Sequence, residues 1–295
     1  MILAVNGAIV WDVRKELLNY NIGKLVIISP LMDDKFYKPS MILSEDCDIS
    51  NNICLDDNVQ IVADESSSVI VENGATIGKE SSIIATDNSR IYIGKNSIIG
   101  ENVAILASGK SNLFIDNNVI IDSKCLIIVE NESIVKLYEE CRLGQTTLVC
   151  RKASEIIFNR KCQLAGENGY IVGDNSAHIT IGALTIFMRQ LYMVCEKSTI
   201  SIGRDCMFSF YIKMNVGSHR IIDKNTNEDI TNLTEIIIGN HFWCGIDATI
   251  LPGCIVEDGS VIGANTIVNK LIPSNCTCAG NTAKILRRNV EWYRN

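Results

Sequence analysis

Three histidines, His178, His219 and His241, are the side chains of this 295-residue chain best suited to moving a proton at neutral pH. Imidazole has an ordinary pKa of about 6.5, and it is therefore the side chain best matched to general base work near neutral pH. His219 lies in the irregular run Gly-Ser-His-Arg-Ile-Ile-Asp, outside the regular apolar spacing of the chain. Loops anchored on a rigid scaffold commonly carry catalytic groups. We therefore predict that His219 acts as a general base.

The charged neighbours of His219 are candidates for supporting roles. Asp223, four residues later, could hold the imidazole in its reactive tautomer, and a backbone carbonyl would serve equally well. Arg220 could contact an acidic substrate, or its side chain could simply be solvated. His178 is next to an inward strand position, so we expect it to face solvent. His241 precedes an aromatic pair and could approach an acceptor cleft.

The elements that must position these groups follow a repeat of about 22 residues. One apolar pattern starts eight times at nearly constant intervals, with further apolar positions six and twelve places later. All 24 positions are apolar or aromatic, where the overall hydrophobic fraction of 47% would give about eleven. The positions are Ile49, Leu55, Ile61, Val71, Ile77, Ile83, Ile93, Ile99, Ile105, Ile115, Ile121, Ile127, Leu137, Leu143, Val149, Phe158, Leu164, Tyr170, Ile181, Phe187, Met193, Ile202, Phe208 and Met214.

A spacing of six is typical of neither an α-helix nor a long strand. It fits a short strand and a turn repeated around a coil, with each sixth side chain stacked on its counterpart one coil later. The chain has 46 Ile and 20 Leu, and a β-branched side chain favours strands. Small residues four positions after each start, among them Cys141, Cys162 and Cys206, are expected inside the corners. These thiols and Cys125 are interpreted as compact core residues.

The repeat tightens near the C-terminus and is interrupted once before that. Apolar residues six apart from Ile238 to Val268 predict two shorter coils, each of three such steps without an extra turn. Twenty-four residues separate Met214 from Ile238, where the same interval elsewhere is about ten. Some fourteen residues therefore leave the coil, and His219 is among them.

From Gly203 to its end, the chain resembles the hexapeptide-repeat acyltransferases, and within them the bacterial polysaccharide O-acetyltransferases. The motifs that carry the resemblance are Ile238-Gly239-Asn240-His241-Phe242-Trp243-Cys244-Gly245, Pro252-Gly253, Val261-Ile262-Gly263-Ala264 and Ala279-Gly280-Asn281-Thr282-Ala283-Lys284. Two features depart from that family: coils longer than its usual three hexapeptides, and His241 where a small or acidic residue is usual. The resemblance implies an all-β solenoid, a left-handed parallel β-helix.

The expected organisation has three parts. Residues 1–40 form an N-terminal cap, with a helix from Ala8 to Tyr20 and a strand from Lys24 to Ser29. Residues 41–282 form the β-helix, with an inserted loop at 215–235. Residues 283–295 form a C-terminal helical tail.

The resemblance also implies the chemistry. It points to an acetyl-CoA-dependent O-acetyltransferase that acts on a sugar hydroxyl of a capsule or lipopolysaccharide, by direct transfer in a ternary complex with His219 as base. Trp243 would cover the pantetheine arm or the acceptor ring, and Ala264 would let the pantetheine pass close to the backbone. Lys270, Lys284 and Arg287 would bind the phosphates of coenzyme A, and no metal is expected. The family is usually trimeric, so a homotrimer is expected.

Three other functions compete with this interpretation. One is N-acetylation of an amino group on a nucleotide-linked sugar, and another is a non-catalytic binding β-helix. The third, a β-helical carbonic anhydrase, is disfavoured because it needs three zinc-binding histidines and the three here are widely separated. A net charge of −7 disfavours nucleic acid and anionic membranes as partners. No apolar run approaches the roughly 18 residues of a membrane span, and a cytoplasmic location is expected.

Overall fold

The structure, a computed structural model, describes residues 47–50, 52–166, 169–217, 220–231 and 234–294. It also describes the backbone of four strands near the N-terminus. These are β1 (Leu3–Val5), β2 (Ala8–Val10), β3 (Leu25–Ile28) and β4 (Met41–Ser44).

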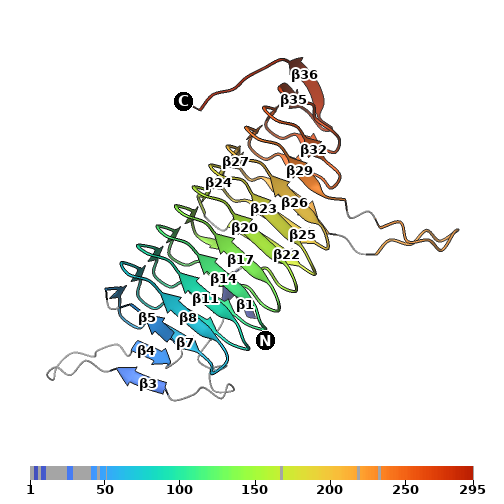
Figure 1. Cartoon of the computed structure of the whole chain (residues 1–295). Helices are drawn as coiled ribbons and strands as arrows, with labels where there is room; N and C mark the ends of the chain where they lie inside the picture. The colour runs from blue at the N-terminus through green and yellow to red at the C-terminus, as the bar shows by residue number, and fades with distance from the viewer. Residues whose placement is uncertain are drawn as a thin grey trace.

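The described chain winds into a long solenoid with three sheets along its sides (Figure 1). Sheet I contains β3, β4, β7 (Gln60–Ala63), β10 (Ser82–Ala85), β13 (Ala104–Ala107), β16 (Leu126–Ile128), β19 (Thr146–Thr147), β22 (Gly169–Asp174), β25 (Tyr192–Glu196), β28 (Lys213–Val216), β31 (Thr249–Ile250) and β34 (Ile267–Val268). Sheet II contains β5 (Cys47–Ile49), β8 (Ser68–Val71), β11 (Arg90–Ile93), β14 (Asn112–Ile115), β17 (Ile134–Leu137), β20 (Glu155–Phe158), β23 (His178–Ile181), β26 (Thr199–Ile202), β29 (Ile236–Ile238) and β32 (Ile255–Val256). Sheet III contains β6 (Cys54–Leu55), β9 (Thr76–Ile77), β12 (Ile98–Ile99), β15 (Ile120–Ile121), β18 (Arg142–Leu143), β21 (Gln163–Leu164), β24 (Ile186–Arg189), β27 (Met207–Phe210), β30 (Trp243–Cys244), β33 (Val261–Ile262), β35 (Cys276–Ala279) and β36 (Lys284–Arg288).

The strand register confirms the predicted coil lengths. Ile83 pairs with Ile61 on one side and Ile105 on the other, which is the predicted step of the long coils. Near the C-terminus, Trp243 pairs with Val261, which is the shorter step of three hexapeptides. Neighbouring strands pair in parallel throughout these coils, which confirms the predicted parallel β-solenoid.

Most of the predicted inward positions form the core, and Ile49 and Leu55 pack against it partly buried. Two positions need correction: Leu148 takes the core position predicted for Val149, and Tyr170 is displaced in the same way. Tyr170 is exposed, and Ile171 is buried in its place. The reason is a slip of one residue: the coil before it is one residue short, and the next is one residue long, as the pairings of Leu126 with Thr147 and of Thr147 with Tyr170 show. Because strand side chains alternate between the two faces, this slip moves Tyr170 to the outside.

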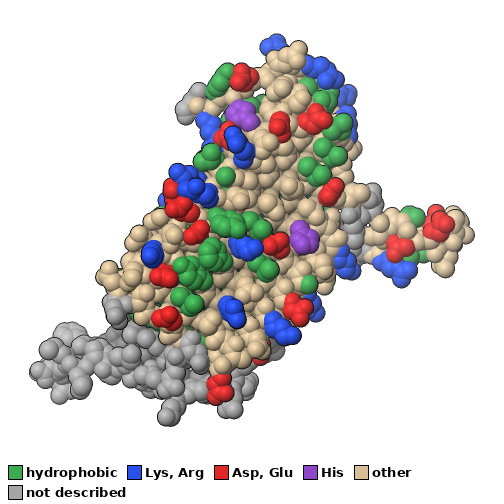
Figure 2. Space-filling view, in the orientation of Figure 1, with side chains coloured by type: hydrophobic (Ala, Val, Ile, Leu, Met, Phe, Trp, Pro, Cys, Tyr) green, Lys and Arg blue, Asp and Glu red, His purple; other side chains and the backbone are tan. Residues whose placement is uncertain are grey.

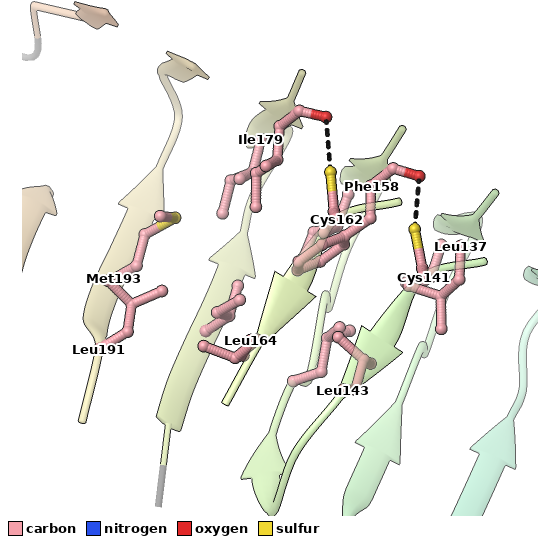
Figure 3. Close-up of a cluster of buried hydrophobic side chains, with 14 of the residues drawn as sticks. Leu137, Cys141, Leu143, Phe158, Cys162, Leu164, Ile179, Leu191 and Met193 are labelled. Carbon is pink, nitrogen blue, oxygen red and sulfur yellow. Dashed lines mark hydrogen bonds between the residues drawn. The ribbon is translucent and has the colours of Figure 1, made fainter. Parts of the chain in front are cut away.

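The four cysteines predicted for the core, Cys125, Cys141, Cys162 and Cys206, are buried. Cys141 and Cys162 are buried on neighbouring coils, and Figure 3 shows their thiols pointing toward backbone carbonyl oxygens. The Sγ of Cys141 lies 2.9 Å from the carbonyl oxygen of Asn159. Burial raises the pKa of Cys125 to about 11 and that of Cys206 to about 11, so both stay protonated at neutral pH. Protonated, buried thiols are poor nucleophiles.

Both predicted terminal helices need correction. Residues Ala8–Val10 form β2, antiparallel to β1, and residues 11–20 of that prediction lie outside the described chain. The predicted strand at 24–29 is confirmed by β3. In the tail, Lys284–Arg288 is a strand, β36, that pairs antiparallel with β35. A strand here satisfies the open backbone edge of sheet III, which a helix would leave unpaired. Among the described residues, no helix has the length and apolar character needed to cross a bilayer.

Candidate functional site

The insertion predicted from the sequence leaves the solenoid where sheet I gives way to sheet II. It departs after β28 and the chain returns in β29, where Ile236 pairs with Ile200 of the preceding coil. His219, the predicted base, lies outside the described residues, as does Ser218. Gly217 and Arg220, the described residues on either side, follow shortly after β28 in the sequence, at the start of the insertion.

Residues 220–231 of the insertion form a narrow antiparallel hairpin, which we call the arm. Ile222 and Asp229 form a bridge, and the amide of Ile230 donates to the carbonyl of Ile221 at 2.9 Å. Figure 1 shows the arm extending outward from the side of the solenoid. Both Ile221 and Ile230 are about half exposed, so the arm presents apolar side chains that the coil of this chain does not cover.

Asp223 holds the turn of the arm. Its Oδ1 accepts the amide of Asn225 at 2.7 Å and that of Thr226 at 3.3 Å. Its own amide donates to the carbonyl of Glu228 at 2.9 Å. This is the usual way in which an aspartate stabilises a turn two or three residues ahead. Because His219 lies outside the described residues, the contact of Asp223 with it stays a prediction. Holding the turn is a separate role of Asp223 that the sequence did not reveal.

Arg220 is paired within the arm. Its Nε donates to Oδ2 of Asp229 at 2.9 Å, and both side chains are largely in solvent. The hydroxyl and amide of Thr231, and then Arg220, lower the pKa of Asp229 to about 2. This carboxylate is thus charged at any ordinary pH. The contact predicted between Arg220 and an acidic acceptor would compete with this ion pair.

We expect Asp223→Ala to loosen the arm and leave the solenoid unchanged, because the two turn amides lose their acceptor. Hydrogen exchange at Asn225 and Thr226 should become about 10-fold faster, which corresponds to about 1.4 kcal/mol. Amides of β27 and β30 are the internal control and should keep their rates. Equal protection of the turn amides in variant and native protein would contradict this role of Asp223.

A groove of about 410 Å³ lies beside the base of the arm on sheet II. Thr234 and Glu235, which lead the chain back from the arm, form one side, and Thr199 and Ile255 line the sheet. Hydroxyl, carboxylate and exposed apolar groups meet here. Such a mixture suits a sugar ring, which has both hydroxyl groups and apolar C–H faces.

Trp243 lies on the outside of sheet III, a different side of the solenoid. Its side chain is 39% exposed, and its ring centroid is 6.0 Å from that of Trp292. Sheet III does not take part in the corner from which the arm leaves, since that corner joins β28 of sheet I to β29 of sheet II. One chain therefore does not bring the arm and Trp243 together.

A polar cluster beside Trp243 was not foreseen from the sequence. His241 lies between Asp205 and the tail, with its Nδ1 2.7 Å from Oδ2 of Asp205 and its Nε2 2.9 Å from the carbonyl oxygen of Trp292. The imidazole also stacks on the Trp292 ring, with centroids 4.2 Å apart. The sequence contained one hint of this cluster: Trp and His are rare in the chain, with three of each, and two Trp and one His meet here.

The residues expected to hold coenzyme A lie toward the C-terminal end of the solenoid. Ala264 is exposed, on the coil above Ile246, whose carbonyl accepts the amide of Asn265 at 2.8 Å. Lys284 and Arg287 are exposed on β36, opposite Ala279 and Thr277.

Lys270 joins this basic region from the coil below. It is exposed, and Lys270 and Arg288 both act electrostatically on Cys278, although burial dominates and raises the pKa of that thiol. Figure 2 shows lysine and arginine side chains gathered over this end of the solenoid. Open positive charge of this kind fits a group with several phosphates. Within the described ranges, no cluster of three or more His, Cys, Asp or Glu could hold a metal ion.

Comparisons with known proteins give the chain its relatives. It is 32% identical over 127 residues to the polysialic acid O-acetyltransferase of Escherichia coli O1:K1, a match that covers 43% of this chain and 41% of the relative. It is 28% identical over 127 residues to the galactoside O-acetyltransferase of E. coli strain K12, covering 41% of this chain and 62% of that protein. The chain thus matches less than two thirds of the length of each of these relatives.

The solved structure of the polySia-specific acetyltransferase NeuO aligns with 78% of this chain and 90% of its own, at 25% identity and a TM-score of 0.47. No family model matches the chain. The named sequence relatives are sugar O-acetyltransferases, as the resemblance of the C-terminal motifs predicted. Over the matched segment, the chain is thus similar to enzymes that acetylate sugar hydroxyl groups.

Proposed function

We propose that this protein transfers an acetyl group from acetyl-CoA to a sugar hydroxyl of a bacterial surface glycan, with His219 as general base. The main support is the insertion between β28 and β29: it interrupts a regular solenoid at one corner, and its sequence carries a histidine, His219, near its start. The segment matched to sugar O-acetyltransferases gives independent support.

The reaction needs a base because an alcohol is a weak nucleophile at neutral pH. In the proposed mechanism, the neutral imidazole of His219 takes the hydroxyl proton while the sugar oxygen attacks the thioester carbon. A backbone N–H that lines the cleft would stabilise the negative oxygen of the tetrahedral intermediate. The C–S bond then breaks, and the imidazolium gives its proton to the departing sulfur, which leaves as the free thiol of coenzyme A. No covalent enzyme intermediate is needed, and the buried, protonated thiols of Cys125 and Cys206 are unsuited to forming one.

The groove beside the arm is the proposed acceptor site. Thr199, Thr234 and Glu235 offer groups that can hydrogen-bond sugar hydroxyls, and Ile255 offers an apolar surface. Lys270, Lys284, Arg287 and the open backbone at Ala264 are the proposed binding groups for coenzyme A. When bound, the coenzyme supplies the activated acetyl group.

We further propose a homotrimer in which each site lies between two chains. The arm and Trp243 lie on different sides of one solenoid, so a site that uses both requires a second chain. The side of the solenoid near Trp243 also exposes Met188, Tyr211 and Ile246, which a neighbouring chain would cover. We place the reaction in the cytoplasm, because acetyl-CoA is made there.

The basic residues give a direct test of the coenzyme site. The double variant Lys284→Ala/Arg287→Ala should raise the KM for acetyl-CoA by about 3- to 30-fold and leave kcat nearly unchanged, because exposed charge contacts contribute modestly and act on binding. The assay follows thiol release. Lys124→Ala, an exposed lysine on a distant coil, is the matched control and should behave as the native protein.

Acetyl-3′-dephospho-CoA sharpens this test. If these cations contact the 3′-phosphate, the native enzyme should lose affinity for the dephosphorylated donor, and the double variant should lose little more. Additive losses would show that the cations bind elsewhere and would contradict the assignment.

The proposed function as a whole is tested by thiol release from acetyl-CoA in the presence of candidate glycans. Acceptor-dependent release is the expected result. Release only with amino sugars on nucleotide carriers would favour N-acetylation, and no release with any acceptor would contradict the proposal.

A further inference from the structure

The last described residues, Val290–Arg294, run back along the solenoid after β36, and we call them the strap (Figure 1). Val290 is anchored near the end, where its amide donates to the carbonyl of Asn275 at 3.0 Å. Arg294 is anchored several coils lower, where its Nη2 donates to the carbonyl of Leu184 at 2.9 Å and that of Cys206 at 3.1 Å. The strap therefore crosses the corner between sheets II and III and ties successive coils together.

The centre of the strap is held by His241. Both ring nitrogens face acceptors, the carboxylate of Asp205 at 2.7 Å and the carbonyl of Trp292 at 2.9 Å. Neither partner can donate a proton to the ring in return when Asp205 is ionised. Two good hydrogen bonds therefore require a proton on both nitrogens, which is the imidazolium form. A neutral imidazole would turn a lone pair toward one of these oxygens.

Two further contacts fix the strap at the same point. The indole Nε1 of Trp292 donates to the carbonyl of His241 at 2.8 Å, and the two rings stack with planes only 10° apart. Arg294 pairs with the second oxygen of Asp205 at 3.0 Å, so one carboxylate holds both His241 and the end of the strap. These contacts are mutually dependent, because Asp205 is shared.

The strap brings Trp292 to Trp243. Trp292 is 6% exposed, and its ring meets that of Trp243 at an angle of 43° with centroids 6.0 Å apart. The open face of Trp243 is thus limited on one side by the strap. Tyr293, the next residue of the strap, is 72% exposed and belongs to the same segment without taking part in this cluster.

We propose that the strap is a positioning element that fixes the indole of Trp243 for the substrate, and that protonated His241 latches it closed. Trp292 and His241 are then positioning residues that act through Trp243. The latch rests on geometry alone, and only its effect on substrate rests on the proposed function.

The latch has a defined pH dependence. Burial by itself lowers the pKa of His241, but the carboxylate of Asp205 and the carbonyl of Trp292 outweigh it and raise the pKa above the usual value, while Arg294 opposes them. His241 also lines a groove of about 530 Å³, and Asp258 and Glu291, which line it too, add negative charge near the imidazole. Because the pKa is raised in the closed form, the latch contributes fully below about pH 6.5 and is lost as the pH rises through the pKa of the closed form.

Fluorine NMR of protein labelled with 5-fluorotryptophan tests the latch without any substrate. The Trp292 signal, assigned with Trp292→Phe, should shift as the pH rises above about 6.5 and the strap opens. In His241→Gln this titration should disappear, and in Asp205→Asn its midpoint should move to lower pH. Tyr293→Ala is the matched control and should titrate as the native protein does. A pH-independent Trp292 signal, or an unchanged titration in His241→Gln, would overturn the latch.

Kinetics test the consequence for substrate. His241→Gln should raise the KM for acetyl-CoA or for the glycan by about 3- to 10-fold, with kcat changed less than about twofold, since the chemistry at His219 is untouched. An unchanged KM in a variant that has lost the titration would refute the positioning role. If no acetyl transfer is found at all, the fluorine titration still tests the latch, so failure of the proposed function is separable from failure of the strap.

Discussion

His219→Ala should lower kcat for acetyl transfer by about 100- to 10,000-fold and leave the KM for acetyl-CoA nearly unchanged. This range is the usual contribution of a positioned general base, and the donor is held by other residues. The native enzyme should lose activity at low pH as the imidazole becomes protonated, because only the neutral ring accepts a proton. The variant should lack this acid limb. Thiol release measured over pH gives both quantities.

His178→Ala is the matched control for this variant. His178 is exposed on sheet II, where its Nδ1 lies 3.8 Å from Oε2 of Glu155, and it neighbours Thr199 of the proposed acceptor groove without belonging to the arm. Its removal should leave kcat and the pH profile as they are. Equal activity of His219→Ala and the native enzyme would exclude the mechanism, and a large loss in His178→Ala would show that the histidines had been assigned wrongly.

Phe208→Ala should destabilise the protein by about 3–5 kcal/mol, the usual cost of removing a fully buried aromatic ring. Phe208 is wholly buried and stacks on Phe187 with centroids 4.5 Å apart and meets Phe242 at 5.5 Å. These rings fill the solenoid where the arm leaves and where Trp243 is held. The variant should therefore lose activity together with stability.

Urea unfolding followed by circular dichroism measures this effect. Because a solenoid can unfold coil by coil, hydrogen exchange in β27 and β30 should be read beside the global transition. Tyr170→Ala is the matched control: its ring stacks on Tyr192 outside the core, so its loss should cost less than about 1 kcal/mol. Comparable losses in both variants would mean that the interior stack is not the main support of this region.

Much of the fold could be predicted because a solenoid repeats a local rule. Ile83, Ile105 and Ile127 occupy equivalent positions since every coil must present an apolar side chain at the same point, and this leaves a period in the sequence. The prediction for Tyr170 was wrong because a coil that is one residue short is followed by one that is one residue long. Their summed length equals that of two regular coils, so the slip between them leaves no trace in the later spacing. The C-terminal strand was mistaken for a helix because its pairing with β35 is a tertiary contact.

The candidate site was predictable only in part. Counting residues between coils revealed the insertion and with it His219. That Asp223 would hold a turn depends on the local hairpin, which the polar run did not reveal. The cluster around His241 joins residues 36 and 51 positions apart in sequence, and no local pattern encodes such contacts.

The most direct measurement is analysis of the product. The protein is incubated with isotope-labelled acetyl-CoA and a glycan isolated from the host's surface, and the acetylated sugar is examined by mass spectrometry before and after mild alkali. Label on the glycan as an alkali-labile ester, made by the native protein and absent with His219→Ala, is the predicted result. An alkali-stable amide, or label that never leaves the coenzyme, would contradict the proposed transfer to a hydroxyl group.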